Sequence, residues 1–168
     1  MPHFPATTYD LTDAGTAHNR IGGRWVPALS GEDMGVLNPR VGQDMGRVVC
    51  STAADVDEAV AIAQVAQVAW AATPIKARAQ ILHRWRVLLE ANLEELSWLV
   101  AHENGKLSGE GRASALKGIE CLEMAISVPN AIQGGTLQVS QGITCEHRYA
   151  PLGVVAGVVP FNFPVMVP

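Results

Sequence analysis

Asn162 is the residue in this sequence whose type and setting best suit catalysis. It lies between two phenylalanines and two prolines, in the run Pro160-Phe161-Asn162-Phe163-Pro164. A carboxamide is neutral at every working pH and offers two N–H donors, so it can polarise a carbonyl without taking its proton. The flanking prolines restrict φ and would help to aim the side chain. Taken alone, such an asparagine is more often a turn former that bonds its own backbone.

An 18-residue run without a formal charge, Pro151 to Pro168, contains this asparagine. Its length would suit a membrane helix, but its prolines and paired valines favour extended backbone. We therefore expect no membrane insertion, and we predict a buried parallel strand over residues 152–159, because such strands read as continuous apolar runs. Gly153 and Gly157 lie inside this strand, where close packing explains them better than a phosphate-binding loop does.

Other groups that could do chemistry are scattered. The three cysteines, Cys50, Cys121 and Cys145, fit neither a zinc nor a disulfide framework, and no metal site is predicted. Cys121 is expected to be an inert thiol buried in a helix. Glu103 and Lys106 flank a helix end and are expected to face solvent. The histidines at positions 83, 102 and 147 have no acid–base partner at a suggestive spacing.

The composition is that of an ordinary globular protein. The 168 residues are 48% hydrophobic and 17% charged, which suits a domain with a real core. A net charge of −4 argues against a nucleic-acid partner held through its phosphates. The odd cysteine count predicts a reduced, cytoplasmic protein, and the first residues show no secretory signal.

The elements that must position Asn162 begin with short strands. Residues 20–26 predict a hairpin with glycines at its turn, and residues 46–50 predict another strand. The period then becomes helical. Thr52-x-x-Asp55 predicts a capping box at the start of the first helix, and Thr73-Pro74 predicts the start of the second, with threonine as its cap.

Two further helices and a ribbon follow. The third helix is expected to open at Asn92 and to close at Asn104-Gly105, a suitable left-handed cap. The fourth is predicted from about Ser108 to Val128, where Pro129 stops it. Residues 136–140 and 143–149 alternate around a glycine turn and predict an extended ribbon. The inward residues of the fourth helix are predicted to be Ala113, Leu116, Ile119, Met124 and Ile126.

The last 18 residues resemble the aldehyde dehydrogenase superfamily, in which a PLGVV…PFNFP segment forms the first strand of the cofactor domain and the turn after it. Further matches follow in the family's order: Gly22-Gly23-Arg24-Trp25, Asn38-Pro39, the helix over residues 55–70, and Glu103-Asn104-Gly105-Lys106. Phe161 and the helix segment 119–123 most resemble methylmalonate-semialdehyde dehydrogenases, acylating enzymes that pass their product to coenzyme A.

The resemblance implies an α/β fold, the N-terminal portion of the aldehyde dehydrogenase fold. This portion comprises a helical layer, the first strand of the Rossmann-like cofactor domain and a β-ribbon. Residues 1–19 would form an N-terminal arm, and residues 20–134 and 151–168 would belong to the NAD(P)-binding domain. Residues 135–150 would be the oligomerisation ribbon, and the catalytic domain would lie outside this chain.

The resemblance also implies covalent catalysis. A cysteine thiolate attacks the aldehyde, the thiohemiacetal passes hydride to NAD or NADP, and water or coenzyme A releases the thioester. Asn162 would donate a hydrogen bond to the oxyanion, and Val159, Pro160 and Phe161 would line the nicotinamide-ribose side.

The nucleophilic cysteine and the general-base glutamate would then be encoded further along, so these 168 residues alone are expected to be inactive. The expected partners are a small-molecule aldehyde and other copies of the chain in a dimer or tetramer. The alternative is a non-catalytic truncated or interaction protein that keeps this fold.

Overall fold

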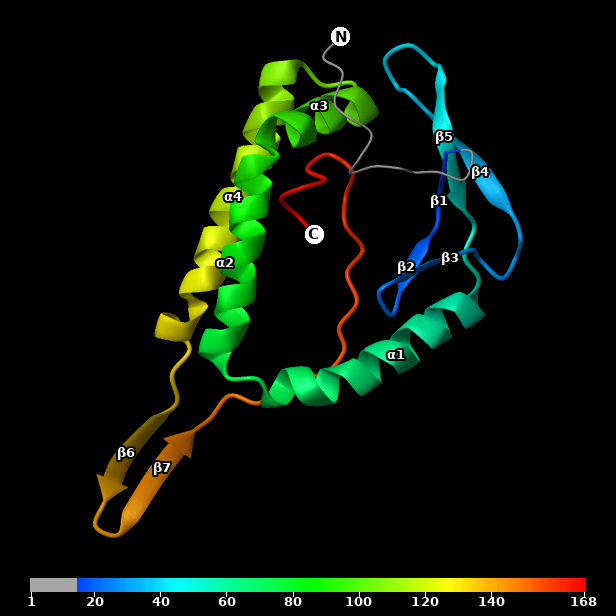
Figure 1. Cartoon of the computed structure of the whole chain (residues 1–168). Coiled ribbons are helices and arrows are strands. Elements are labelled where there is room, and N and C mark those ends of the chain that lie inside the picture. The colour runs from blue at the N-terminus through cyan, green and yellow to red at the C-terminus, as the bar shows by residue number, and fades with distance from the viewer. Residues whose placement is uncertain (1–14) are drawn as a thin grey trace.

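A computed structural model describes residues 15–168 and shows helices and small sheets arranged around a central C-terminal segment (Figure 1). On one side lies a three-stranded sheet in the order β1-β5-β4. Its strands are Thr16–Ala17, Asp44–Val49 and Asp33–Leu37, with β1 parallel and β4 antiparallel to β5. The last residues of the predicted arm are therefore bound to this sheet, and residues 1–14 lie outside the described part.

The predicted hairpin over residues 20–26 is confirmed as β2 (Asn19–Ile21) paired with β3 (Arg24–Val26). Gly22 and Gly23 form its turn with φ of 57° and 77°, in the left-handed region where a Cβ is strained. The strand predicted over residues 46–50 is confirmed as β5. Both segments could be predicted because their conformation follows from local residue types.

Four helices follow: α1 (Ala53–Ala72), α2 (Ile75–Ala91), α3 (Leu93–Asn104) and α4 (Ser108–Ala131). In Figure 1, α2, α3 and α4 form one group, and α1 runs from this group to the strands. Two of the predicted helix ends are wrong. Thr73 does not cap α2; its hydroxyl donates to the carbonyl of Ala69 (2.9 Å) at the end of α1. Pro129 does not stop α4, because the turn beyond it closes through Ile132 N–H and the Val128 carbonyl (2.9 Å).

The inward face of α4 consists mainly of small residues and matches the predicted face only in part: Ile119 is buried as expected. Met124 is 71% exposed, and Ala113 is also exposed. A Cβ on Gly111 would collide with the carbonyl oxygen of Ser97 in α3, so the backbones of the two helices approach closely. The buried residues of α4 are Gly111, Ser114, Ala115, Gly118, Ile119 and Leu122.

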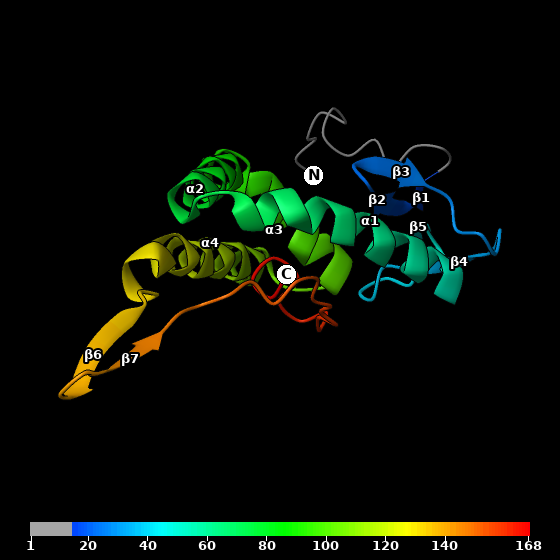
Figure 2. The ribbon, with the colours of Figure 1, turned by 90° about the horizontal axis from the view of Figure 1, so that it is seen from below.

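The predicted ribbon is confirmed as β6 (Gly135–Ser140) paired antiparallel with β7 (Ile143–His147). Gly142 takes φ 75° in the turn between them. Both views show this ribbon projecting away from the helices (Figures 1 and 2). All residues of β7 are exposed, so both faces of this ribbon are accessible.

The strand predicted over residues 152–159 is wrong for the described residues. Residues 151–160 run extended but join no sheet, and all of them are exposed. Leu152 is 94% exposed and Val158 101%. A strand needs neighbours to take its backbone hydrogen bonds, and no described strand lies beside this segment.

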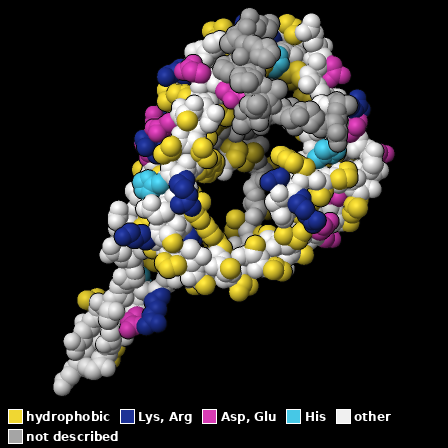
Figure 3. All heavy atoms as spheres, in the orientation of Figure 1, with side chains coloured by type: hydrophobic (Ala, Val, Ile, Leu, Met, Phe, Trp, Pro, Cys, Tyr) yellow, Lys and Arg dark blue, Asp and Glu magenta, His cyan; other side chains and the backbone are white. Residues whose placement is uncertain are grey.

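Apolar side chains remain widely accessible across the fold. Only six hydrophobic residues are buried among residues 15–168, and exposed ones are spread over the face in Figure 3. Exposed apolar area of this extent is characteristic of surfaces that meet another part of a protein. Within the described residues, no helix combines the length and apolarity needed to cross a bilayer.

The start of α1 is fixed by Asp55, a carboxylate only 4% exposed. Its carboxylate accepts from the backbone N–H and the hydroxyl of Thr52, both at 2.7 Å. Its own backbone N–H donates to the Thr52 hydroxyl oxygen (3.4 Å), which completes the predicted capping box. The carboxylate also accepts from the backbone N–H of Leu29 at 3.0 Å and thereby ties the helix to the loop after β3. The hydrogen bond from the Thr52 backbone N–H lowers the pKa of the Asp55 carboxyl, and the bonds from the Thr52 hydroxyl and the Leu29 N–H lower it further.

Asp55→Asn should therefore destabilise the protein in a pH-dependent way. Because folding lowers the pKa of Asp55, its charge stabilises the fold above about pH 4 and ceases to do so as the pH falls through the lowered value. We expect a Tm about 3–6 °C below wild type at pH 7 and a smaller gap at pH 3. Thermal unfolding followed by circular dichroism measures this, with exposed Asp57→Asn as the control. A gap of constant size at both pH values would contradict the assignment.

Candidate functional site

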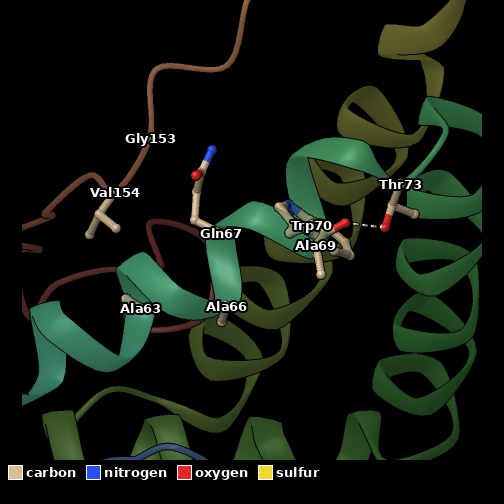
Figure 4. A pocket seen from close by; sticks show the side chains of 8 residues that line it. All are labelled: Ala63, Ala66, Gln67, Ala69, Trp70, Thr73, Gly153 and Val154. Carbon is tan, nitrogen blue, oxygen red and sulfur yellow. Dashed lines mark hydrogen bonds between the residues drawn. The ribbon is translucent and has the colours of Figure 1, made fainter.

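The segment that leads to Asn162 runs beside α1. A groove of about 530 Å³ separates the two; Gly153 and Val154 lie on one side, and Ala63, Gln67 and Trp70 are among the α1 residues on the other (Figure 4). An adjoining hollow continues the groove along Leu152, Val155 and Ala156. The groove is mostly apolar. The residues that line the groove all lie upstream of Asn162, so the asparagine is not part of the groove.

The bend over residues 160–167 turns this extended segment back in a single helical turn. The backbone N–H of Val167 donates to the carbonyl of Phe163 (3.1 Å). The turn predicted at the prolines around Asn162 is present, although the segment before it is not the predicted strand. In Figure 1 the bend lies inside the ring formed by the helices and strands.

Lys106 anchors one side of the bend. Its ammonium donates to the backbone carbonyl of Asn162 and lies 4.7 Å from the ring centroid of Phe163. The prediction that Lys106 faces solvent is therefore wrong. Its neighbour Glu103 remains exposed, although partial burial raises the pKa of its carboxyl.

Gly118 of α4 supports the other side of the bend. A Cβ at this position would lie 2.9 Å from both Cγ1 and the carbonyl oxygen of Val165. The bend therefore lies directly on the helix backbone, in space that only glycine leaves free. This contact places Val165 against the same helix that packs on α3.

The side chain of Asn162 is exposed and forms no hydrogen bond among the described residues. The alternative in which this amide only satisfies its own turn thus finds no support in the structure. Both N–H donors of the carboxamide are available to a ligand. Of the predicted cofactor-binding residues, Val159 is 47% and Phe161 85% exposed, and Pro160 is also exposed.

The remaining candidate groups form no catalytic cluster within residues 15–168. Cys50, Cys121 and Cys145 are free thiols. Cys121 is exposed, so its predicted burial is wrong; it lies beside the small-residue face of α4 and not on it. His102 stacks on Trp98 with ring centroids 4.7 Å apart, and His147 contacts the ring of Tyr149 edge-on.

Sequence reasoning missed Lys106 and Gly118 as parts of the site. Signals for both were present: Lys106 closes the Glu103-Asn104-Gly105-Lys106 motif, and Gly118 lies seven residues after Gly111, on the same helix face. The sequence does not show that residues 163–165 return to this face of α4.

Comparison with known proteins agrees with the fold and the motifs. The profile of the Aldehyde dehydrogenase family matches residues 25–168. Malonate-semialdehyde dehydrogenase 2 of Geobacillus thermodenitrificans is 42% identical over 159 residues, which cover 94% of this chain and 33% of the relative. Malonate-semialdehyde dehydrogenase 1 of Geobacillus kaustophilus is 43% identical, with 89% of this chain and 31% of the relative covered.

Solved structures give the same result. Methylmalonate-semialdehyde dehydrogenase from Oceanimonas doudoroffii superposes with a TM-score of 0.86 at 33% identity, over 91% of this chain and 31% of that one. PnpE in complex with nicotinamide adenine dinucleotide superposes with a TM-score of 0.83 at 31% identity, over 91% and 31% of the two chains. This chain thus spans about a third of the length of the proteins it matches.

Gly118→Ala should displace the bend, and Gly109→Ala is its matched control. Both glycines lie in α4, but a Cβ at Gly109 would meet nothing within 4 Å. We expect Gly109→Ala to be neutral or slightly stabilising, since alanine is the better helix former. Gly118→Ala should cost about 1–3 kcal/mol through overpacking and should speed hydrogen exchange in residues 163–168. Equal stability and equal exchange in the two variants would refute the contact.

Proposed function

The chain belongs to the aldehyde dehydrogenase family, and from this premise we propose that it is the amino-terminal third of a longer NAD(P)-dependent enzyme that oxidises an aldehyde. The coverage of only 33% of a close relative supports this proposal. The exposed apolar side chains of α1 and the unpaired residues 151–160 support it as well, because both are surfaces that further strands and helices would cover.

Asn162 carries the proposal. In the oxidation, a cysteine thiolate outside these residues adds to the aldehyde carbon, and negative charge develops on the carbonyl oxygen. The Asn162 amide donates a hydrogen bond to that oxygen. The single observation behind this role is a carboxamide with no partner among the described residues, on a bend whose backbone is anchored elsewhere. An unpaired donor on an anchored backbone need not break another hydrogen bond when charge appears on the substrate oxygen.

The residues before Asn162 suit a dinucleotide. Val159, Pro160 and Phe161 are accessible apolar side chains directly upstream of the oxyanion donor, and we assign them to the nicotinamide-ribose side. NAD, or alternatively NADP, supplies the hydride acceptor when bound. The chain itself contributes these exposed apolar side chains and, through Asn162, a donor to the reacting carbonyl beside them.

The substrate class is inferred from the relatives. Their names are those of malonate- and methylmalonate-semialdehyde dehydrogenases, and we propose a semialdehyde as substrate with transfer of the acyl group to coenzyme A. Cys50, Cys121 and Cys145 take no part in this chemistry. All three are free thiols, and Cys121 and Cys145 are exposed.

The proposed division of the chain follows the same reasoning. Residues 20–134 and 151–168 belong to the cofactor domain, and residues 135–150 form a ribbon for oligomerisation. The ribbon projects from the body with open strand edges, which are templates for pairing with another subunit. A homodimer or homotetramer is the proposed assembly.

Asn162→Ala in the full-length protein tests the central claim. We expect kcat to fall by about 10²–10³ with unchanged Tm, because one oxyanion donor is lost. Steady-state NADH formation with a semialdehyde substrate measures the effect. Cys121→Ser is the control and should retain wild-type activity. A loss smaller than tenfold for Asn162→Ala would remove the oxyanion role, and an inactive Cys121→Ser would overturn the assignment of the thiol.

Release of the acyl group is tested separately. If the thioester passes to coenzyme A, NADH formation should accelerate on adding coenzyme A, and the acyl-coenzyme A product should appear with it. Product analysis by mass spectrometry measures both. A rate indifferent to coenzyme A, with the free acid as product, would favour hydrolysis and leave the role of Asn162 standing.

A further inference from the structure

We propose that Lys106 is a positioning residue that fixes the direction of the Asn162 amide. This inference rests on the oxyanion role proposed for Asn162. Lys106 itself touches no reacting group; it contacts the backbone of the residue that does, and the ring that follows.

Two contacts from one ammonium define the backbone at the bend. The Lys106 Nζ donates to the carbonyl of Asn162, and it also lies 4.7 Å from the ring centroid of Phe163. The first contact fixes the peptide plane that leaves Asn162. The second contact holds the ring of Phe163, the residue that follows this peptide bond. With this peptide held, the direction of the Asn162 Cα–Cβ bond is set by the backbone.

Lys106 is available to hold the bend because it forms no ion pair with a described carboxylate. Among the ion pairs of residues 15–168, none includes Lys106. Its side chain is half-buried. Both of its described polar contacts go to residues 162 and 163, which distinguishes it from a lysine held on the surface by an ion pair.

The backbone from which Lys106 extends is itself held. Gly105 closes α3 in the left-handed conformation with φ 70°, and a Cβ there would lie 3.3 Å from Cγ of Pro39. Asn38, only 6% exposed, donates from Nδ2 to the carbonyl of His102 (3.2 Å). The loop after β4 therefore holds the end of α3, and Lys106 projects from this junction to the bend.

The other anchor cannot replace Lys106. Gly118 receives Val165, three residues beyond Asn162, and so holds the return arm of the bend. Without the ammonium, the 162–163 peptide could rotate while Val165 stayed in place. The amide would then point away from the oxyanion in part of the population, and kcat would fall more than substrate affinity.

The test is a double-mutant cycle in the full-length protein with Lys106→Met, Asn162→Ala and the combination. Methionine keeps the length and apolar character of the lysine stem and removes the charge. We expect Lys106→Met to lower kcat about tenfold or more with KM nearly unchanged. In the Asn162→Ala background the same substitution should lower kcat less than twofold, because the group it positions is gone.

Two further variants separate positioning from general damage. Lys106→Arg keeps a charged donor that can stack on an aromatic ring and should retain kcat within about threefold. Lys76→Met, at an exposed lysine of α2, should match wild type. Hydrogen exchange of residues 161–167 should be faster in Lys106→Met than in Lys76→Met, and this readout is independent of activity.

The outcomes distinguish this inference from the function on which it rests. If Lys106→Met lowers kcat equally with and without the Asn162 amide, or leaves kcat and exchange unchanged, Lys106 does not position Asn162. If Asn162→Ala alone has no effect on kcat, the oxyanion role fails and the positioning role fails with it, whatever exchange shows. Faster exchange, a selective loss of kcat and non-additivity together support the proposal.

Discussion

The two buried glycines of α4, Gly111 and Gly118, are the constraint on which the rest of the structure depends. At Gly111 the helix backbone approaches α3 so closely that a Cβ would meet the Ser97 carbonyl. Seven residues later, Gly118 admits Val165 of the bend onto the same face. One helix thus holds both the layer below it and the segment that bears Asn162. A larger residue at Gly111 would push α3 away from α4, and a larger residue at Gly118 would push the bend away.

Where the sequence determines conformation locally, prediction was reliable. The Thr52–Asp55 box begins α1, glycines turn the hairpin at residues 22–23, and Gly105 closes α3 in the left-handed conformation. Each follows from hydrogen bonds or φ values within a few residues. The capping role expected of Thr73 is also a local feature, but it was predicted wrongly, because the Thr73 hydroxyl donates to the carbonyl of Ala69 in the preceding helix.

Prediction failed where the answer depends on distant packing. Of the residues expected on the inward face of α4, Ile119 is buried, but Met124 and Ala113 are exposed. Close contact with α3 and the bend selects small residues such as Gly111 and Gly118 for much of this face. The apolar residues 152–159 were expected to form a buried strand, yet a strand is a property of its neighbours as much as of its own residues. Lys106 resembles any solvated lysine until the chain returns to it after a separation of 56 residues.

The backbone carbonyl and the side-chain amide of Asn162 differ in their hydrogen bonding at the bend. Its backbone carbonyl is taken by the Lys106 ammonium, so the main chain is satisfied within the protein. Its side-chain amide has no partner among the described residues and is left for a ligand. A turn-forming asparagine accepts a backbone N–H with its side-chain oxygen, as Asn38 does from Arg40 (2.9 Å), and Asn162 makes no such bond among the described residues. A lysine from another element holds the backbone of the bend, so the carboxamide is not needed there and both of its N–H donors stay available to a transient oxyanion.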